Sequence, residues 1–185
     1  MTVKAAPTNF PERRLSDIPT VTPMQMREIQ RAAQETFHYD ILQQIENGGR
    51  AAAQLVLAMF GGEGHGQKVV VLAGGGHVGA AGLCAARHLD NWGFQTEPIL
   101  GEVENQMSFT TQRQLHILTE SGIAEPHDSD ISEHTVENHL HRTDLIIDAL
   151  VGYGLEGPPT GLAAAATEIA SASHRPILAL DIPTG

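Results

Sequence analysis

Three glycines with the spacing Gly74-x-Gly76-x-x-Gly79 stand between an apolar run and a segment of helical character. Glycine lets the backbone approach a phosphate without a Cβ clash, and a helix that begins there offers free N–H groups and the positive end of its dipole. Glu97 follows at about 20 residues, the distance at which an acidic residue can hold a ribose hydroxyl in a dinucleotide site. The alternative is a tight turn from strand to helix that binds nothing.

Two acidic residues, Asp148 and Asp181, stand near the ends of later apolar runs, and a turn that contains glycine follows each of them. In open parallel sheets, ligands bind beyond the carboxyl ends of the strands. A pair of carboxylates at that edge can bind a cation, hold a ribose or move a proton. The alternative is that both accept hydrogen bonds from loop or helix-cap N–H groups.

The elements that must position these residues follow from hydrophobic patterning. Apolar runs without alternation predict strands that are buried on both faces of a parallel sheet, at 68–73 and 144–150. Two further strands are expected at 94–100 and 176–181. Helical spacing, caps and terminal glycines predict helices at 22–37, 40–60, 80–92, 106–120, 130–141 and 162–173. Strands that alternate with helices predict an α/β fold with three layers, doubly wound and Rossmann-like, around a mostly parallel sheet. Residues 1–21 are expected to be an irregular leader and 22–185 a single domain.

Charge and composition narrow the classes of partner. The 185 residues carry 11 Lys and Arg against 22 Asp and Glu, a formal net charge of −11. This balance argues against nucleic acid and an anionic membrane surface as partners. No apolar run reaches the about 18 residues of a membrane-spanning helix, and the single Cys84 excludes an internal disulfide. We therefore expect a cytoplasmic protein without a nucleic-acid or membrane partner.

Five segments, in this order, resemble motifs of the YjeF N-terminal domain, the NAD(P)H-hydrate epimerase family. A helix of the T-x-x-x-M-R type is matched at 22–32, and an M-E-N-A-G-R-A segment at 45–51. The glycine loop G-x-G-N-N-G-G-D-G with its helix is matched at 74–89, D-L-I-I-D-A-L-x-G-x-G-L at 144–155, and D-I-P-S-G at 181–185. The resemblance implies the YjeF N-terminal type of α/β fold.

The resemblance also implies an activity and its partners. The implied substrate is NADH or NADPH damaged by hydration of the nicotinamide ring, and the implied reaction interconverts its R and S hydrates. An ADP- or ATP-dependent dehydratase, as a further domain or a separate protein, would then restore the cofactor. Because the family continues past D-I-P-S-G with further strands, we expect this domain to lack its final strands. Either a partner subunit, such as that of a homodimer, covers the open edge, or the sequence is a fragment from a truncated gene model.

Site residues are carried over from the family motifs position by position. Asp148 is the implied catalytic acid or base. Asp148, Thr184 and the backbone of Val78 are the implied ligands of a K⁺ ion, at a site weakened because Val78 has no side-chain oxygen. The implied substrate-binding residues are Gly76, His77, Val78, Gly79, Ala80, Ala81, Gly152, Tyr153, Gly154, Leu155, Glu156, Gly157, Pro158 and Asp181.

Departures from the family pattern keep two other functions open. His77 and Ala81 replace an Asn and an Asp of the glycine loop, and Glu102 stands near the position of an expected basic residue. These losses favour a catalytically degenerate module that binds a nucleotide or a protein on the same fold. The third reading is a Rossmann oxidoreductase that uses the glycine loop and Glu97.

Overall fold

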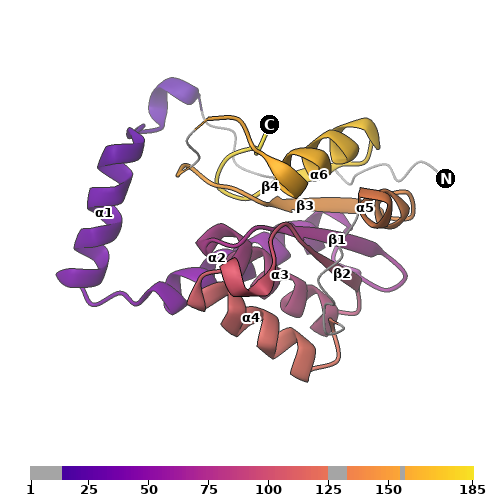
Figure 1. The fold of residues 1–185 in the computed structure, drawn as a ribbon. Coiled ribbons are helices and arrows are strands. Elements are labelled where there is room, and N and C mark those ends of the chain that lie inside the picture. Colours follow the sequence, from indigo (N-terminus) through magenta and orange to yellow (C-terminus); the bar gives the residue numbers. More distant parts are fainter. Residues whose placement is uncertain (1–13, 125–132, 155–156) are drawn as a thin grey trace.

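The structure, a computed structural model, describes residues 14–124, 133–154 and 157–185 (Figure 1). Its elements are η1 Leu15–Asp17, α1 Pro23–Glu35, α2 Ile41–Met59, β1 Lys68–Ala73, α3 His77–Asn91, β2 Gln95–Leu100, η2 Glu104–Gln106, α4 Phe109–Glu120, α5 Glu133–Leu140, β3 Leu145–Ala149, α6 Gly161–Ala172 and β4 Ile177–Ala179. Of the predicted irregular leader, residues 1–13 lie outside the described part, and η1 is a short 3-10 helix. Within the described residues, no helix has both the length and the apolar character that crossing a membrane requires.

The four strands form one parallel sheet in the order β2-β1-β3-β4, which confirms the predicted fold class. Strand β1 lies between β2 and β3. The chain therefore runs from β1 to β2 on one side and later enters β3 on the other side of β1. This reversal of direction between β1 and β3 is a topological switch point, where open α/β sheets bind ligands beyond the carboxyl ends of the strands.

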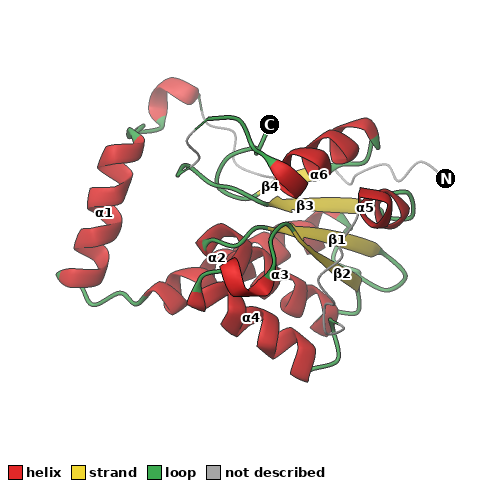
Figure 2. Cartoon of the chain, viewed as in Figure 1, coloured by secondary structure: helices red, strands yellow, loops and turns green. Residues whose placement is uncertain are grey.

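Helices cover both faces of the sheet (Figure 2). Alternate residues of β1 face opposite sides because successive strand side chains point to opposite faces: Val69 and Val71 pack with residues of α2, α3 and α4. Val70 and Leu72 pack with residues of α5 and α6. The apolar run of β1 is therefore buried on both faces, as its sequence predicts.

The helix starts follow their capping residues. The side chains of Thr22 and Asp40 accept N–H bonds at the first turns of α1 and α2, and Gln25 and Gln43 complete two capping boxes. Helix α3 begins at His77, three residues before the predicted start, with Gly76 as its N-cap residue. The last three positions of the glycine pattern, residues 77–79, are thus already helical.

Close approaches explain one of the two glycines inside α2. Gly48 and Gly49 do not interrupt α2, because the helix runs through them. A Cβ on Gly49 would lie 2.6 Å from the Cβ of Cys84 and 2.7 Å from the carbonyl oxygen of Ala81. Gly49 is therefore required where α2 crosses α3.

Helix α1 stands apart from the sheet and its covering helices (Figure 1). None of its residues is buried, and the Met24 side chain is 75% exposed. The hydroxyl of Tyr153, in the loop after β3, donates a hydrogen bond to the Gln30 side chain. This bond links α1 to the edge of the sheet at which the predicted site lies.

Candidate substrate site at the carboxyl edge of the sheet

Asp148 and Thr184 form a buried pair near the end of β3. The Thr184 hydroxyl donates to Asp148 Oδ1 at 2.7 Å, and the Thr184 N–H donates to Oδ2 at 2.9 Å. The Leu150 N–H adds a third bond to Oδ1 at 3.2 Å. The two residues are 8% and 3% exposed. Three donors therefore fix the orientation of one buried carboxylate.

Asp181 lies at the same edge, next to the turn that follows β3. It accepts a 2.8 Å hydrogen bond from the Tyr153 N–H and has a positive φ of 70°. Gly152 fits between Asp181 and Val78: a Cβ there would overlap the Asp181 carboxylate and lie 2.6 Å from Val78 Cγ2. The turns after β1, β3 and β4 thus meet in one place, where Asp181 lies against Gly152.

The glycine turn after β1 is held from outside by α4. The Ser108 N–H donates to the Gly75 carbonyl at 2.8 Å, and the Thr111 hydroxyl lies 2.8 Å from that oxygen and 2.9 Å from the Gly76 carbonyl oxygen. Gly79 packs so closely on Gly74 that a Cβ would overlap the Gly74 carbonyl. These bonds fix the turn at the start of α3. The first N–H groups of a helix have no acceptor within the helix, so its N-terminus favours an anion.

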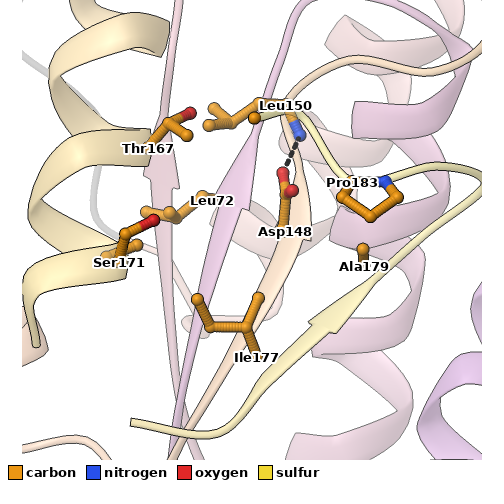
Figure 3. A pocket seen from close by; sticks show the side chains of 10 residues that line it. Leu72, Asp148, Leu150, Thr167, Ser171, Ile177, Ala179 and Pro183 are labelled. Atoms are coloured by element: carbon orange, nitrogen blue, oxygen red, sulfur yellow. Dashed lines mark hydrogen bonds between the residues drawn. The ribbon is translucent and has the colours of Figure 1, made fainter. Parts of the chain in front are cut away.

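A cavity of about 210 Å³ lies beside Asp148, between the sheet and α6 (Figure 3). Its walls include Leu72, Ile177 and Pro183, with the hydroxyl groups of Thr167 and Ser171 on the helix side. A dry cavity of roughly 150 Å³ is enough to bind benzene. The space beside Asp148 therefore has the size of a single ring.

Comparisons with known proteins bear on this arrangement. A family model described as the YjeF-related protein N-terminus matches residues 42–185. The chain belongs to this family. The crystal structure of the yeast protein ynu0 has the same fold, with a TM-score of 0.78 and 23% identity over 91% of this chain and 72% of that chain.

Three curated relatives carry related names. An NAD(P)H-hydrate epimerase from Dehalogenimonas lykanthroporepellens is 38% identical over 91% of this chain and 65% of its own length. An NAD(P)H-hydrate epimerase from Rhodopirellula baltica is 33% identical over 91% of this chain and 66% of its own length. A bifunctional NAD(P)H-hydrate repair enzyme from Moorella thermoacetica is 27% identical over 89% of this chain and 31% of its own length. The chain thus spans just under two thirds of the two epimerases.

The residues carried over from the YjeF motifs divide into three groups. Asp148, Thr184, Asp181, Gly152 and Tyr153 come together around the turns after β3 and β4. The first turn of α3 contains His77, Val78 and Gly79, and Gly76 is its cap. The third group, on the loop toward α6, comprises the exposed Gly154, Gly157 and Pro158, while Leu155 and Glu156 lie outside the described residues.

Three carried-over positions differ from the expected geometry. Val78 is the second residue of α3, so its carbonyl runs along the helix toward its C-terminal end, and only its side chain approaches Gly152. The Ala80 side chain is fully buried with Ile45 of α2. Ala81 packs against the same small cluster. In this YjeF domain, Ala80 and Ala81 therefore support the helix crossing with their side chains.

The ribose role predicted for Glu97 is wrong. Glu97 pairs with Val70 in the middle of the sheet register, three residues before the carboxyl end of β2. Its carboxylate contacts Lys68 Nζ and His139 Nδ1. The distance along the chain fitted the Rossmann pattern, but β2 continues beyond Glu97, so this carboxylate is not at the ligand edge.

Sequence reasoning missed a polar cluster between α2 and α3. Glu46 accepts from Arg87 Nη2 at 2.6 Å, contacts His88 Nε2 at 2.8 Å, and accepts from the Cys84 thiol at 3.2 Å. Burial favours a higher pKa for Glu46, but hydrogen bonds from Cys84, His88 and Arg87 together hold that pKa below its usual value. Burial, followed by the neighbouring Glu46, raises the pKa of the Cys84 thiol to about 12. The cluster joins the two helices, because Cys84, Arg87 and His88 of α3 all contact the carboxylate of Glu46 on α2.

Proposed function

We propose that this protein is an NAD(P)H-hydrate epimerase, an isomerase that interconverts the R and S hydrates of NADH or NADPH. The observation that carries the proposal is the buried Asp148–Thr184 pair near the carboxyl end of β3, beside a cavity of single-ring size between the sheet and α6. The names of the relatives from Dehalogenimonas and Rhodopirellula support the same reaction. A cytoplasmic location belongs to this proposal.

The proposed chemistry needs one group that donates and then accepts a proton. Hydration leaves a hydroxyl on a ring carbon, and inversion of that carbon requires its C–O bond to break and to form again on the other face. Asp148, in its acid form, donates a proton to the leaving oxygen, and the bonding electrons leave with the water. The ring cation, stabilised by the ring nitrogen, takes up water from the opposite face, and the proton that this water loses returns to the Asp148 carboxylate through the solvent.

The other groups of the site bind and orient the substrate. The N-terminus of α3 receives the pyrophosphate, because its free N–H groups and dipole favour negative charge. Asp181, held by the Tyr153 N–H, accepts a bond from a ribose or ring hydroxyl. The three donors on Asp148 keep its carboxylate directed at the ring.

A K⁺ ion is part of the proposal, with a reduced set of ligands. Asp148 and Thr184 fit such an ion, since their oxygens lie 2.7 Å apart and the hydroxyl keeps lone pairs free after it donates to the carboxylate. Val78 does not fit, because it has no side-chain oxygen and its carbonyl belongs to the ladder of α3. When bound, the ion would balance negative charge beside the ring. We expect a weak requirement for K⁺, measured as activity against KCl with choline chloride as the control salt.

Two partners are proposed. A dehydratase that acts on one hydrate would consume the product, and the bifunctional name of the Moorella relative supports such a link.

A second copy of the chain is the other partner, supported by the exposed side chains of Met24, Ile29 and Phe37 on and after α1. Sedimentation of the protein and of a Met24→Glu/Ile29→Glu variant tests the dimer: a wild-type monomer would contradict it.

The decisive assay is chromatographic. Purified (R)-NADHX is mixed with the protein, and conversion to the S form is compared with the spontaneous rate. Asp148→Asn is expected to lose at least about 100-fold, the usual contribution of a proton-transfer group. Asp90→Asn, which removes a carboxylate near the far end of α3, is the matched control and is expected to keep full activity. No acceleration by the wild-type protein would refute the proposal.

A catalytically degenerate binding module is the second candidate. The absence of side-chain oxygens at Val78 and Ala81 favours it. Calorimetric titration with NADH discriminates the two candidates: tight binding without turnover of either hydrate would support the module.

A further inference from the structure

Glu102 occupies the position at the carboxyl end of β2 that the sequence pattern assigned to Glu97. Strand β2 ends at Leu100, and the Gly101 N–H donates to the Ala73 carbonyl at 2.7 Å, which holds the chain beside the glycine turn. The Glu102 carboxylate then lies directly against Gly75, where a Cβ would overlap it. Gly75 therefore provides the space for this carboxylate at the ligand edge.

The order of the strands indicates which part of a dinucleotide Glu102 would face. Neighbouring strands lie about 5 Å apart, so the ends of β2 and β3 are separated by roughly 10 Å, with β1 between them. If the ring is beside Asp148 at β3 and the pyrophosphate is at α3 beyond β1, the adenosine half extends toward β2. In such sites, an acidic residue near the end of β2 accepts from the ribose 2′-hydroxyl, whereas an Arg accommodates a 2′-phosphate.

Glu102 carries its charge at the surface of the protein. In the described ranges 14–124, 133–154 and 157–185, its side chain makes no ion pair or hydrogen bond, and it is exposed. Gly75 lies against the Glu102 carboxylate and close to the backbone of Met107 in the loop before α4, and the Ser108 N–H already donates to the Gly75 carbonyl. A 2′-phosphate, with a charge of about −2, would meet a like charge here without a counter-ion.

We propose that Glu102 selects the 2′-hydroxyl of the adenosine ribose and rejects a 2′-phosphate, so that the protein prefers NADHX to NADPHX. This inference rests on the proposed epimerase function. It assigns Glu102 a role in specificity and none in the chemical step, since it lies two strands away from Asp148.

The test compares the two substrates with two variants at low ionic strength, where screening is weak. The wild-type protein is expected to favour NADHX over NADPHX by at least about 10-fold in kcat/KM, and Glu102→Gln to reduce this preference to about 3-fold or less by improving NADPHX. Glu104→Gln is the matched control: it removes the same charge two residues away in η2, without contact to Gly75, and is expected to keep the wild-type preference.

Failure of the inference and failure of the epimerase function give different results. Equal kcat/KM values for the two hydrates, or a preference that Glu102→Gln leaves unchanged, would overturn the role of Glu102 while the activity stands. If neither hydrate is converted, calorimetry with ADP-ribose and its 2′-phosphate decides the matter. A preference for ADP-ribose that Glu102→Gln removes would support the inference, and its absence would overturn it.

Discussion

Replacing Thr184 with Val tests the buried pair at the centre of the site. Valine keeps the shape of threonine and loses the hydroxyl that donates to Asp148 Oδ1 at 2.7 Å. Both residues are buried, so water cannot replace the missing donor without opening the turn. A hydrogen bond to a charged group contributes about 1.5–3 kcal/mol, and we expect the free energy of unfolding to fall by that amount. For a protein of this size, the melting temperature would fall by roughly 3–12 °C.

Urea unfolding followed by circular dichroism measures the change, and two further variants isolate the hydroxyl. Thr184→Ser keeps the donor and loses one methyl group, which contributes about 0.8 kcal/mol. Thr184→Ala loses both, so the expected order of stability is wild type, Ser, Val, Ala. In the epimerase assay, Thr184→Val should lower kcat because the Asp148 carboxylate loses one of its three fixed donors. A Thr184→Val protein within about 0.5 kcal/mol of wild type would refute the reasoning.

Three other predictions concern groups around the site. Gly152→Ala should displace Asp181 or Val78 and destabilise the protein by roughly 1–3 kcal/mol, measured by urea unfolding; unchanged stability and substrate affinity would contradict the packing. The Cys84 thiol, whose pKa is about 12 in the folded protein, should resist iodoacetamide at pH 8 and react fully in urea, as followed by mass spectrometry. Glu46 has a lowered pKa when folded, so its charged form stabilises the fold fully above the unfolded pKa, and this stabilisation is lost as the pH falls through the folded pKa. The stability difference between Glu46→Gln and wild type should therefore shrink between pH 7 and about pH 3.5, and a constant difference would count against the cluster.

Much of the fold follows from local patterns in the sequence. The apolar runs of β1 and β3 are buried on both faces, and such runs identify central parallel strands before any contact is known. Thr22 and Asp40 begin their helices because a side-chain acceptor at that position satisfies N–H groups that have no partner within the helix. These signals act within a few residues, so a single sequence is enough to find them.

Part of the candidate site could be predicted from the sequence. Asp148 and Asp181 lie toward the same edge of the sheet because parallel strands bring their carboxyl ends to one edge, which the order of elements implies. Glu97 was misplaced because spacing along the chain cannot fix where a strand ends. The contact of Glu102 with Gly75 could not be predicted, because it depends on the path of the chain after β2. The cluster of Glu46 with Arg87 and His88 joins helices that are distant in sequence.

The dependence of the glycine turn on α4 has a consequence for engineering. The turn owes its shape to the Thr111 hydroxyl and the Ser108 N–H, which hold the carbonyls of Gly75 and Gly76 from a separate part of the chain. Transplanting residues 74–79 alone into a related scaffold would leave those two oxygens without their anchors. A working graft must carry the first turn of α4 as well, so the smallest exchangeable unit of this binding edge is made of two segments.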